Sequence, residues 1–334
     1  MTELYLIRHA EAEGNVFRRL HGQYNSRITP NGQKQIAALE QRFRDVVIDA
    51  VYASDLYRTC RTAEAIYVPK GLELHKEPRF RELNCGIWED LPFGWLAMFD
   101  RERNRTFSFD PQNWSVEEGE TFPVYTGRFL EALEEIVRRH EGQTVAIFSH
   151  GMVMRGILQR LFFPEEKELG HAENTAVTKL LWDGKGYTLE CLNDASHITH
   201  EISTLGKQLW WRKGDKKDFN LWFRDRQSED SAFLAQQGFG ETDDLRIAML
   251  KDRPVGALAI QDQDAEALTV AHIGLIEEER GKGLSAQLLG EAVSRARKMG
   301  KTHLRLPEGE FCPAAKALFG TYGFQGGTLD LRIE

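Results

Sequence analysis

The chain has 334 residues, enough for two domains of ordinary size, and its 41% hydrophobic residues can form a core in each. Its net charge of −8 argues against general nucleic-acid binding, which favours a basic surface. No apolar run is long enough to cross a membrane, and the first residues lack the regions of a signal peptide. Four scattered cysteines form neither a metal-binding nor a disulfide pattern, so we expect reduced thiols in a cytoplasmic protein that holds no metal: Cys60, Cys85, Cys191 and Cys312.

The first predicted element is a short buried strand, formed by the four apolar residues from Leu4 to Ile7. Arg8 and His9 follow it directly. In an open α/β sheet the carboxyl ends of the strands are where ligands bind. His9 is therefore a candidate nucleophile, and Arg8 can bind an oxyanion with two hydrogen bonds.

The next elements place a second arginine in a similar position. Thr29 and Pro30 are typical of a helix start, and the helix is predicted to run to about Phe43. Residues 50–53 read as a strand, and Arg58 falls in the first turn of the helix after it. The positive end of a helix dipole favours anions there.

Further along the chain a carboxyl group and a second histidine appear. Glu82 lies in a segment rich in charged residues, and residues 90–118 are predicted to form an irregular, lid-like excursion with short helices. A helix is expected over 122–140 and a buried strand over 144–148. His150 and Gly151 follow that strand, where the next helix begins.

Two histidines and two arginines that follow the carboxyl ends of strands suit the binding of a phosphoryl dianion. The arginines neutralise its charge, one imidazole attacks phosphorus, and the other donates a hydrogen bond to the equatorial oxygens. A carboxylic acid then protonates the leaving oxygen.

Residues 1 to about 198 resemble the histidine phosphatase superfamily, also called the phosphoglycerate mutase-like family. The resemblance rests on segments that occur in the family's order: Leu6-Ile7-Arg8-His9, Asn15, the segment from Ser54 to Thr59, Arg81-Glu82-Leu83-Asn84-Cys85-Gly86, Ser149-His150-Gly151, residues 173–177 and residues 192–197. It implies a three-layer α/β domain with a mainly parallel sheet.

The resemblance also implies a role for each site residue. His9 would form a phosphohistidine, and Glu82 would protonate the leaving alcohol. The remaining residues would form the phosphate pocket and bind substrate: Arg8, Asn15, Gln23, Arg58, His150 and Gly151. Ala10 and Ala12 stand where the family usually has glycine and threonine, and loss of the threonine removes one possible hydroxyl contact near the pocket.

Family members divide into hydrolases and mutases. Mutases carry a longer insertion and a tail that shield the phosphohistidine from water, and neither is recognisable here. We therefore expect hydrolysis of a small phosphomonoester without a metal, with mutase chemistry as a minor alternative.

Residues 199–217 are predicted to be a linker before a second domain at 218–334. The linker is basic and aromatic around Trp210 and Trp211. It could contact a nucleotide or nucleic acid, or its tryptophans could pack between domains. In the second domain, strands are expected over 219–224, 245–250, 255–260, 268–275 and 303–306, with helices over 230–237, 285–299 and 313–324.

A glycine loop lies between the fourth of these strands and the helix after it, in the segment Arg280-Gly281-Lys282-Gly283-Leu284-Ser285. Backbone N–H groups at such a helix start suit a pyrophosphate. The loop and the closing Tyr322-Gly323-Phe324 resemble the GNAT family of acetyl-CoA-dependent N-acetyltransferases. This resemblance implies an α+β domain with a mixed sheet that binds acetyl-CoA through the six loop residues.

Phe319 stands where many GNAT members carry a tyrosine that protonates the leaving thiolate. Ser285 and Cys312 also depart from the family pattern, and Tyr322 could replace the missing acid or simply pack beside Gly323. Three hypotheses follow: a phosphatase whose GNAT half also acetylates an amine, one whose GNAT half is only an acyl-CoA sensor or docking module, and a lone phosphatase activity. The expected partners are a small phosphomonoester and acetyl-CoA; the oligomeric state is not predicted.

Overall fold

The computed structural model describes all residues except 166–168, 209–218, 240–243, 307–318 and 334. The chain forms two compact units. The first unit comprises residues 1–12, 21–89 and 102–205, and the second comprises residues 13–20, 90–101 and 206–334. Within the described residues, no helix has the length and apolar character needed to span a membrane.

The first unit is built on a six-stranded sheet with strand order β3-β2-β4-β1-β5-β6. Neighbours from β3 to β1 are parallel, and β5 and β6 are antiparallel additions at one edge. The mainly parallel sheet confirms the predicted fold class. Its strands are β1 (Thr2–Arg8), β2 (Ala50–Ala53), β3 (Leu74–Lys76), β4 (Thr144–Ser149), β5 (Val177–Trp182) and β6 (Tyr187–Asp194).

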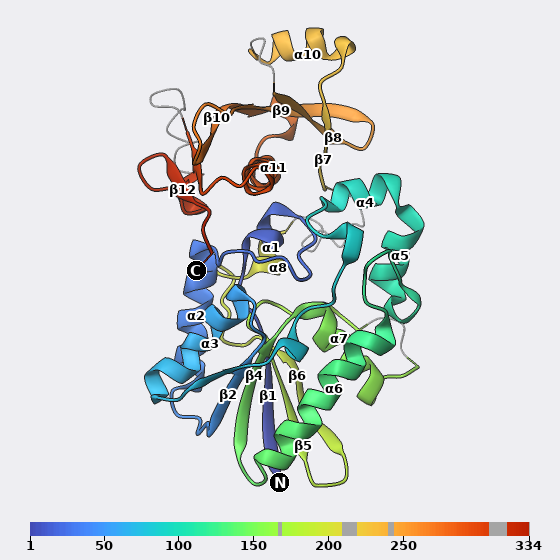
Figure 1. The fold of residues 1–334 in the computed structure, drawn as a ribbon, viewed down its shortest axis with the longest axis vertical. Coiled ribbons are helices and arrows are strands. Elements are labelled where there is room, and N and C mark those ends of the chain that lie inside the picture. The colour runs from blue at the N-terminus through green and yellow to red at the C-terminus, as the bar shows by residue number, and fades with distance from the viewer. Residues whose placement is uncertain (166–168, 209–218, 240–243, 307–318, 334) are drawn as a thin grey trace. The chain divides into compact units, whose positions relative to one another are not determined.

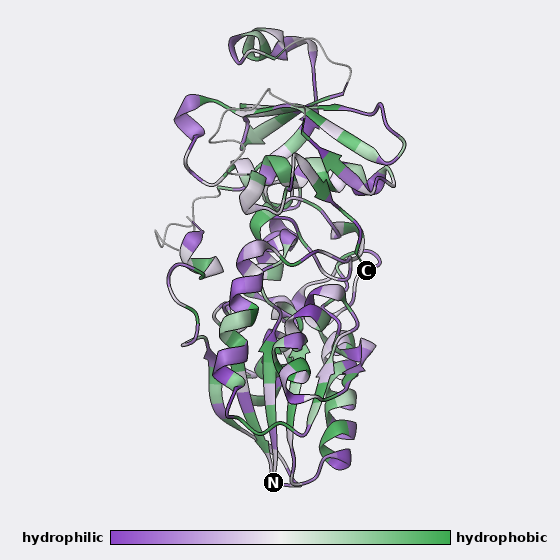
Figure 2. Ribbon diagram, turned by 90° about the vertical axis from the view of Figure 1, so that its left-hand side faces the viewer, coloured by the Kyte–Doolittle hydropathy of each residue, from purple (hydrophilic) through white to green (hydrophobic). Residues whose placement is uncertain are grey.

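Helices cover this sheet, whose strands are largely hydrophobic (Figures 1 and 2). The predicted helix start at Thr29 is confirmed, since its Oγ1 accepts the N–H of Gly32 at 2.9 Å. Ile36, Leu39 and Phe43 bury one face of that helix in a core shared with the sheet. The main helices are α2 (Pro30–Phe43), α3 (Tyr57–Lys70), α6 (Phe122–Arg139) and α7 (Gly151–Phe162).

The segment between Glu82 and α6 contains short helices, as expected. They are α4 (Phe93–Phe99) and α5 (Arg101–Phe109), with the 3-10 helices η2 (Gly86–Trp88) and η3 (Pro111–Asn113). Residues 90–101 belong to the second unit and the rest to the first. The remaining short helices are α1 (Glu13–Phe17), α8 (Thr204–Lys207), η1 (Pro78–Phe80), η4 (Ser228–Asp230) and η5 (Glu277–Glu279).

The second unit has its own six-stranded sheet, with strand order β12-β11-β10-β9-β8-β7. Only β10 and β11 run parallel, so the sheet is mixed, as predicted. Its elements are β7 (Trp222–Asp225), α10 (Ser231–Gln236), β8 (Leu245–Leu250), β9 (Arg253–Gln261), β10 (Ala267–Leu275), α11 (Ser285–Lys298), β11 (His303–Arg305) and β12 (Thr328–Asp330). The first strand starts at Trp222 rather than at Phe219, and the first half of the predicted helix at 313–324 lies outside the described residues.

The core of the second unit includes a residue from far earlier in the chain. Phe17, at the end of α1, is 4% exposed and belongs to the cluster that contains Leu288 and Leu289 of α11. A Cβ added at Gly290 would lie 2.4 Å from Phe17 Cβ, so glycine is what allows this approach. Beside it, the buried Arg19 forms an ion pair with Glu291 at 2.9 Å.

Candidate functional site

His9 lies where the two central strands of the first unit end. Arg8 is opposite Ser149 in the parallel register of β1 and β4, and the backbone N–H of His9 donates to the Ser149 carbonyl at 3.0 Å. His150 follows Ser149, so the strand pairing brings the two histidine rings to a centroid distance of 5.3 Å. The structure therefore brings His9 and His150 together, as the sequence predicted.

The hydrogen bond at His9 determines which ring nitrogen can attack. Its Nδ1 lies 2.7 Å from the Ala10 carbonyl oxygen, and a carbonyl only accepts. Nδ1 must therefore carry the proton, which leaves the lone pair on Nε2. Burial, followed by the charges of Arg58 and Arg8, lowers the pKa of His9 well below its usual value, so the ring is neutral at pH 7. A neutral imidazole with a free Nε2 lone pair is a competent nucleophile.

Arg58 is completely buried at the start of α3 and joins three parts of the pocket. Its Nε donates to Nδ1 of His150 at 3.2 Å, while its Nη atoms donate to the carbonyls of Tyr24 at 3.1 Å and Gly22 at 2.6 Å. His150 therefore carries its proton on Nε2, which donates to Ser54 Oγ at 2.7 Å. Burial lowers the pKa of Arg58 to about 10, and it remains a cation.

Arg8, a half-buried residue, supplies the second cation. Its Nη1 donates to the Ala172 carbonyl, whereas its buried Nε has no hydrogen-bond partner among the described residues. A Cβ added at Gly151 would come within 3.2 Å of that Nε, so Gly151 lies directly against Arg8. A buried N–H donor without a partner, beside a second arginine, is what an anionic ligand would satisfy.

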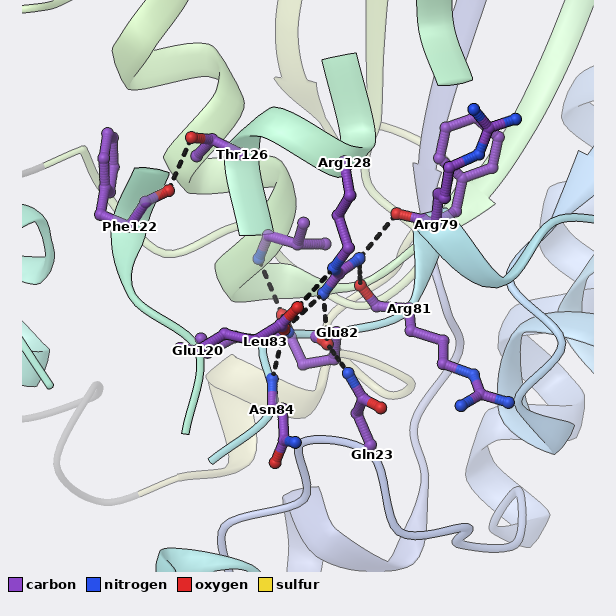
Figure 3. A network of polar contacts seen from close by, with 12 residues as sticks. Gln23, Arg79, Arg81, Glu82, Leu83, Asn84, Glu120, Phe122, Thr126 and Arg128 are labelled. Atoms are coloured by element: carbon purple, nitrogen blue, oxygen red, sulfur yellow. Dashed lines mark hydrogen bonds and ion pairs between the residues drawn. The ribbon is translucent and has the colours of Figure 1, made fainter. Parts of the chain in front are cut away.

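The carboxyl group of Glu82 is held at the N-terminus of α7. Oε1 accepts the N–H of Val153 at 2.7 Å and Oε2 that of Met152 at 2.9 Å, and Figure 3 shows its surroundings. Burial raises the pKa of Glu82, although these N–H groups and Arg58 act in the opposite direction. A raised carboxyl pKa favours the protonated form that a general acid needs.

The structure places the two predicted substrate-binding side chains differently. Gln23 lies in the first unit, where its Nε2 donates to the Glu82 carbonyl at 3.0 Å (Figure 3). Asn15 lies in α1 of the second unit, and its carbonyl accepts from Gln208 at 3.4 Å. The predicted role of Asn15 therefore remains a prediction from the family resemblance.

Sequence reasoning missed two residues of this site. The ring of the half-buried His21 lies nearly perpendicular to that of His9, with centroids 5.6 Å apart. Its only sequence signal was its position before Gly22 in a glycine-bearing loop. Arg128 of α6 contacts the main chain around Glu82, and an arginine on an amphipathic helix carries no such signal.

The predicted acyl-CoA loop has the backbone shape of an anion cradle. Gly281 and Gly283 have φ angles of +73° and +77°, and a Cβ added at either would meet nothing within 4 Å. The helix α11 begins at Ser285 without a side-chain cap on its first N–H groups. Left-handed glycines before an uncapped helix start create the N–H concavity that binds phosphates, so the loop fits a pyrophosphate.

Two aromatic residues of the second unit bear on acetyl transfer. Phe319 is 2% exposed and packs in the core against Phe324, with ring centroids 5.4 Å apart. Tyr322 is partly buried against the same core, and its ring lies 5.8 Å from that of Phe17. Cys312 and the tryptophans of the predicted linker, Trp210 and Trp211, lie outside the described residues.

The buried histidines predict a pH dependence of stability. The pKa of His150 is lowered well below 6.5, mainly by burial, so below pH 6.5 the unfolded chain binds a proton that the folded chain does not. Stability then falls as pH drops, by about 1 kcal/mol per such histidine between pH 6.5 and 5.5. In urea unfolding, His150→Gln should lose about that much less stability than the parent over this pH range. His200→Gln, at an exposed histidine, should lose as much as the parent. Equal pH slopes in all three proteins would contradict this.

Comparison with known proteins gives two family matches in one chain. The model of the histidine phosphatase superfamily (branch 1) matches residues 4–195, and that of the acetyltransferase (GNAT) family matches residues 207–324. The probable phosphoglycerate mutase GpmB of Erwinia tasmaniensis is 31% identical over 205 residues, which are 59% of this chain and 95% of that protein. The GpmB protein of Serratia proteamaculans is 30% identical over 206 residues, with the same coverage of each chain.

Solved structures give the same result. YhfR of Bacillus stearothermophilus has a TM-score of 0.57 and 31% identity, over 60% of this chain and all of that one. A phosphoserine phosphatase variant from Entamoeba histolytica, in complex with phosphoserine, has a TM-score of 0.52 and 25% identity, also over 60% of this chain and all of that one. These relatives match the region that the first family model covers, and they are consistent with the geometry around His9. The GNAT match follows in the same chain. The chain belongs to the histidine phosphatase superfamily.

Proposed function

We propose that the protein hydrolyses a small phosphomonoester through a phosphohistidine at His9. The observation that carries this proposal is the hydrogen bond from His9 Nδ1 to the Ala10 carbonyl, because it leaves Nε2 as the nucleophile of a neutral ring. Arg8 and Arg58 supply positive charge next to that ring, and Glu82 supplies a carboxyl group with a raised pKa. These are the parts that phosphoryl transfer to nitrogen requires.

In the first step Nε2 of His9 attacks phosphorus, and the ester P–O bond breaks. Protonated Glu82 gives its proton to the departing oxygen, so the alcohol leaves neutral. The two arginines balance the charge that develops on the phosphoryl oxygens. The products are the free alcohol, phosphorylated His9 and ionised Glu82.

In the second step a water molecule gives a proton to Glu82 while its oxygen bonds to phosphorus. The P–N bond breaks and its electron pair returns to His9 Nε2. Inorganic phosphate leaves, and both residues are back in their starting protonation states. Nδ1 of His9 keeps its proton throughout, because the Ala10 carbonyl holds it.

Mutase chemistry is the alternative, since the GpmB relatives carry the name probable phosphoglycerate mutase. In a mutase the phosphoryl group would pass from His9 to a second hydroxyl instead of water. The phosphoserine phosphatase among the similar structures favours water as the acceptor. Release of free phosphate from the labelled phosphoenzyme, with no acceptor alcohol added, distinguishes the two.

A second function is favoured by the loop before α11. Backbone N–H groups from Gly281 to Ser285 are suited to the pyrophosphate of acetyl-CoA, with Arg280 and Lys282 adding positive charge. When bound, the coenzyme would supply an activated acyl thioester. Phe319 cannot donate a proton and is buried in the core, so binding without efficient transfer is the favoured form. The second unit would then be an acyl-CoA sensor or docking module.

The nucleophile is tested by His9→Ala. We expect phosphatase activity to be lost with every substrate, because no intermediate can form without the imidazole. Acid quench with a labelled substrate should place label on His9 of the parent and none on the variant. His200→Ala, an exposed histidine of the same unit, should retain full activity. Near-normal turnover of His9→Ala would refute the proposed mechanism.

The acid is tested by Glu82→Gln with two leaving groups. Loss of a general acid typically costs roughly 10²–10⁴-fold in rate, and the cost is greatest where the leaving oxygen needs a proton. We therefore expect a large fall in kcat/KM, which reports formation of the phosphoenzyme, on glycerol 2-phosphate and a small one on p-nitrophenyl phosphate. Equal losses on both would show that Glu82 does not protonate the leaving group.

The acyl-CoA loop is tested by Gly283→Val, measured by calorimetry with acetyl-CoA. A β-branched side chain at φ +77° distorts the cradle and blocks the approach of the pyrophosphate, so binding should be abolished. Gly300→Val is the matched control, because Gly300 has φ +72° at the other end of α11 and open space around it. Equal affinities in the two variants, or no binding by the parent, would contradict the proposal.

A further inference from the structure

We propose that Arg128, together with Glu120, is a positioning residue for the proton donor Glu82. The pair fixes the main chain on both sides of Glu82, so that its carboxyl group is aligned before substrate arrives. This inference rests on the proposed function, because it concerns the step in which Glu82 protonates the leaving alcohol. Among the described residues, the polar contacts of Arg128 do not include His9.

Arg128 projects from α6 onto the loop that carries Glu82 (Figure 3). Its Nη1 donates to the carbonyls of Arg79 at 2.6 Å and Arg81 at 2.8 Å, and its Nη2 donates to the carbonyl of Glu82 at 2.9 Å. One guanidinium thus holds three carbonyls within four consecutive residues. Such planar, multiple donation is specific to arginine, because a lysine ammonium is a single point.

Glu120 completes the arrangement on the other side of Glu82. It accepts from Arg128 Nε at 2.7 Å and Nη2 at 2.8 Å, and its Oε2 also accepts the backbone N–H of Asn84 at 2.9 Å. Both side chains of the pair are less than one fifth exposed, at 17% and 18%. The ion pair therefore reaches the main chain before and after Glu82 from a site shielded from water.

The main chain and the carboxyl group of Glu82 form hydrogen bonds with residues of two different helices. Arg128 of α6 holds its carbonyl, while Met152 and Val153 of α7 donate to its carboxyl oxygens. Proton transfer requires the donor to lie within hydrogen-bond reach of the leaving oxygen, and small displacements cost rate. Loss of the Arg128 contacts should therefore weaken acid catalysis more than nucleophilic attack.

The test compares Arg128→Gln with the parent on glycerol 2-phosphate and p-nitrophenyl phosphate. We expect kcat/KM, which reports formation of the phosphoenzyme, to fall by roughly 10²-fold on the alkyl ester and by less than about threefold on the aryl ester. In a Glu82→Gln background the same substitution should add almost nothing, because the step it supports is already lost. Arg138→Gln, on the same helix in an exposed pair with Glu134, should behave as the parent.

Two further variants separate positioning from charge and from folding. Arg128→Lys keeps the charge but cannot hold three carbonyls, so we expect it to retain the defect on the alkyl ester; full rescue would overturn the proposal. Glu120→Gln preserves shape and should show the same preference for the aryl ester, even if Arg128→Gln fails to fold. Equal losses on both esters, or additivity with Glu82→Gln, would also overturn it. If Glu82→Gln shows no leaving-group dependence, the proposed acid role fails first.

Discussion

The chemistry of the first unit depends on two arginine side chains buried beside histidine rings. Arg58 is fully buried and Arg8 is half-buried, and among the described residues neither forms an ion pair with a carboxylate. Their charge, together with burial, keeps His9, His21 and His150 neutral. A neutral imidazole is what a nucleophile requires, so in the proposed mechanism the groups that would attract the anion also prepare the residue that would attack it.

This arrangement has a cost that a bound anion would offset. Buried cations without paired carboxylates are unfavourable, and the unpartnered Nε of Arg8 adds to that. A phosphate would supply both the missing charge and the missing acceptor, and a ligand that binds only the folded state stabilises it. Under the proposed function, the pocket is organised for its ligand at a cost in stability to the ligand-free protein, as is typical of preorganised electrostatic sites.

Much of this could be predicted from the sequence, because it depends on local patterns. Apolar runs that end in Arg8 and His9 or in His150 indicated strands, and strand ends meet at one edge of a parallel sheet. The contacts of Arg128 and the ring of His21 could not be predicted, since they depend on how α6 and the loop around Gly22 pack against distant residues. Nor did the sequence show that both ring nitrogens of His150 form hydrogen bonds, Nδ1 with Arg58 and Nε2 with Ser54.

The placement of Phe17 limits how the domains of this protein could be exchanged. Residues 13–20 and 90–101 lie inside the histidine phosphatase match at 4–195, yet they fold with residues 206–334. The boundary between the two family matches therefore does not coincide with the boundary between the two units, and the chain passes from one unit to the other at several places. A GNAT domain from another protein, inserted as a cassette, would lack a partner shaped for Phe17 and Arg19. An exchange of the second unit would therefore have to include residues 13–20 and 90–101 as well.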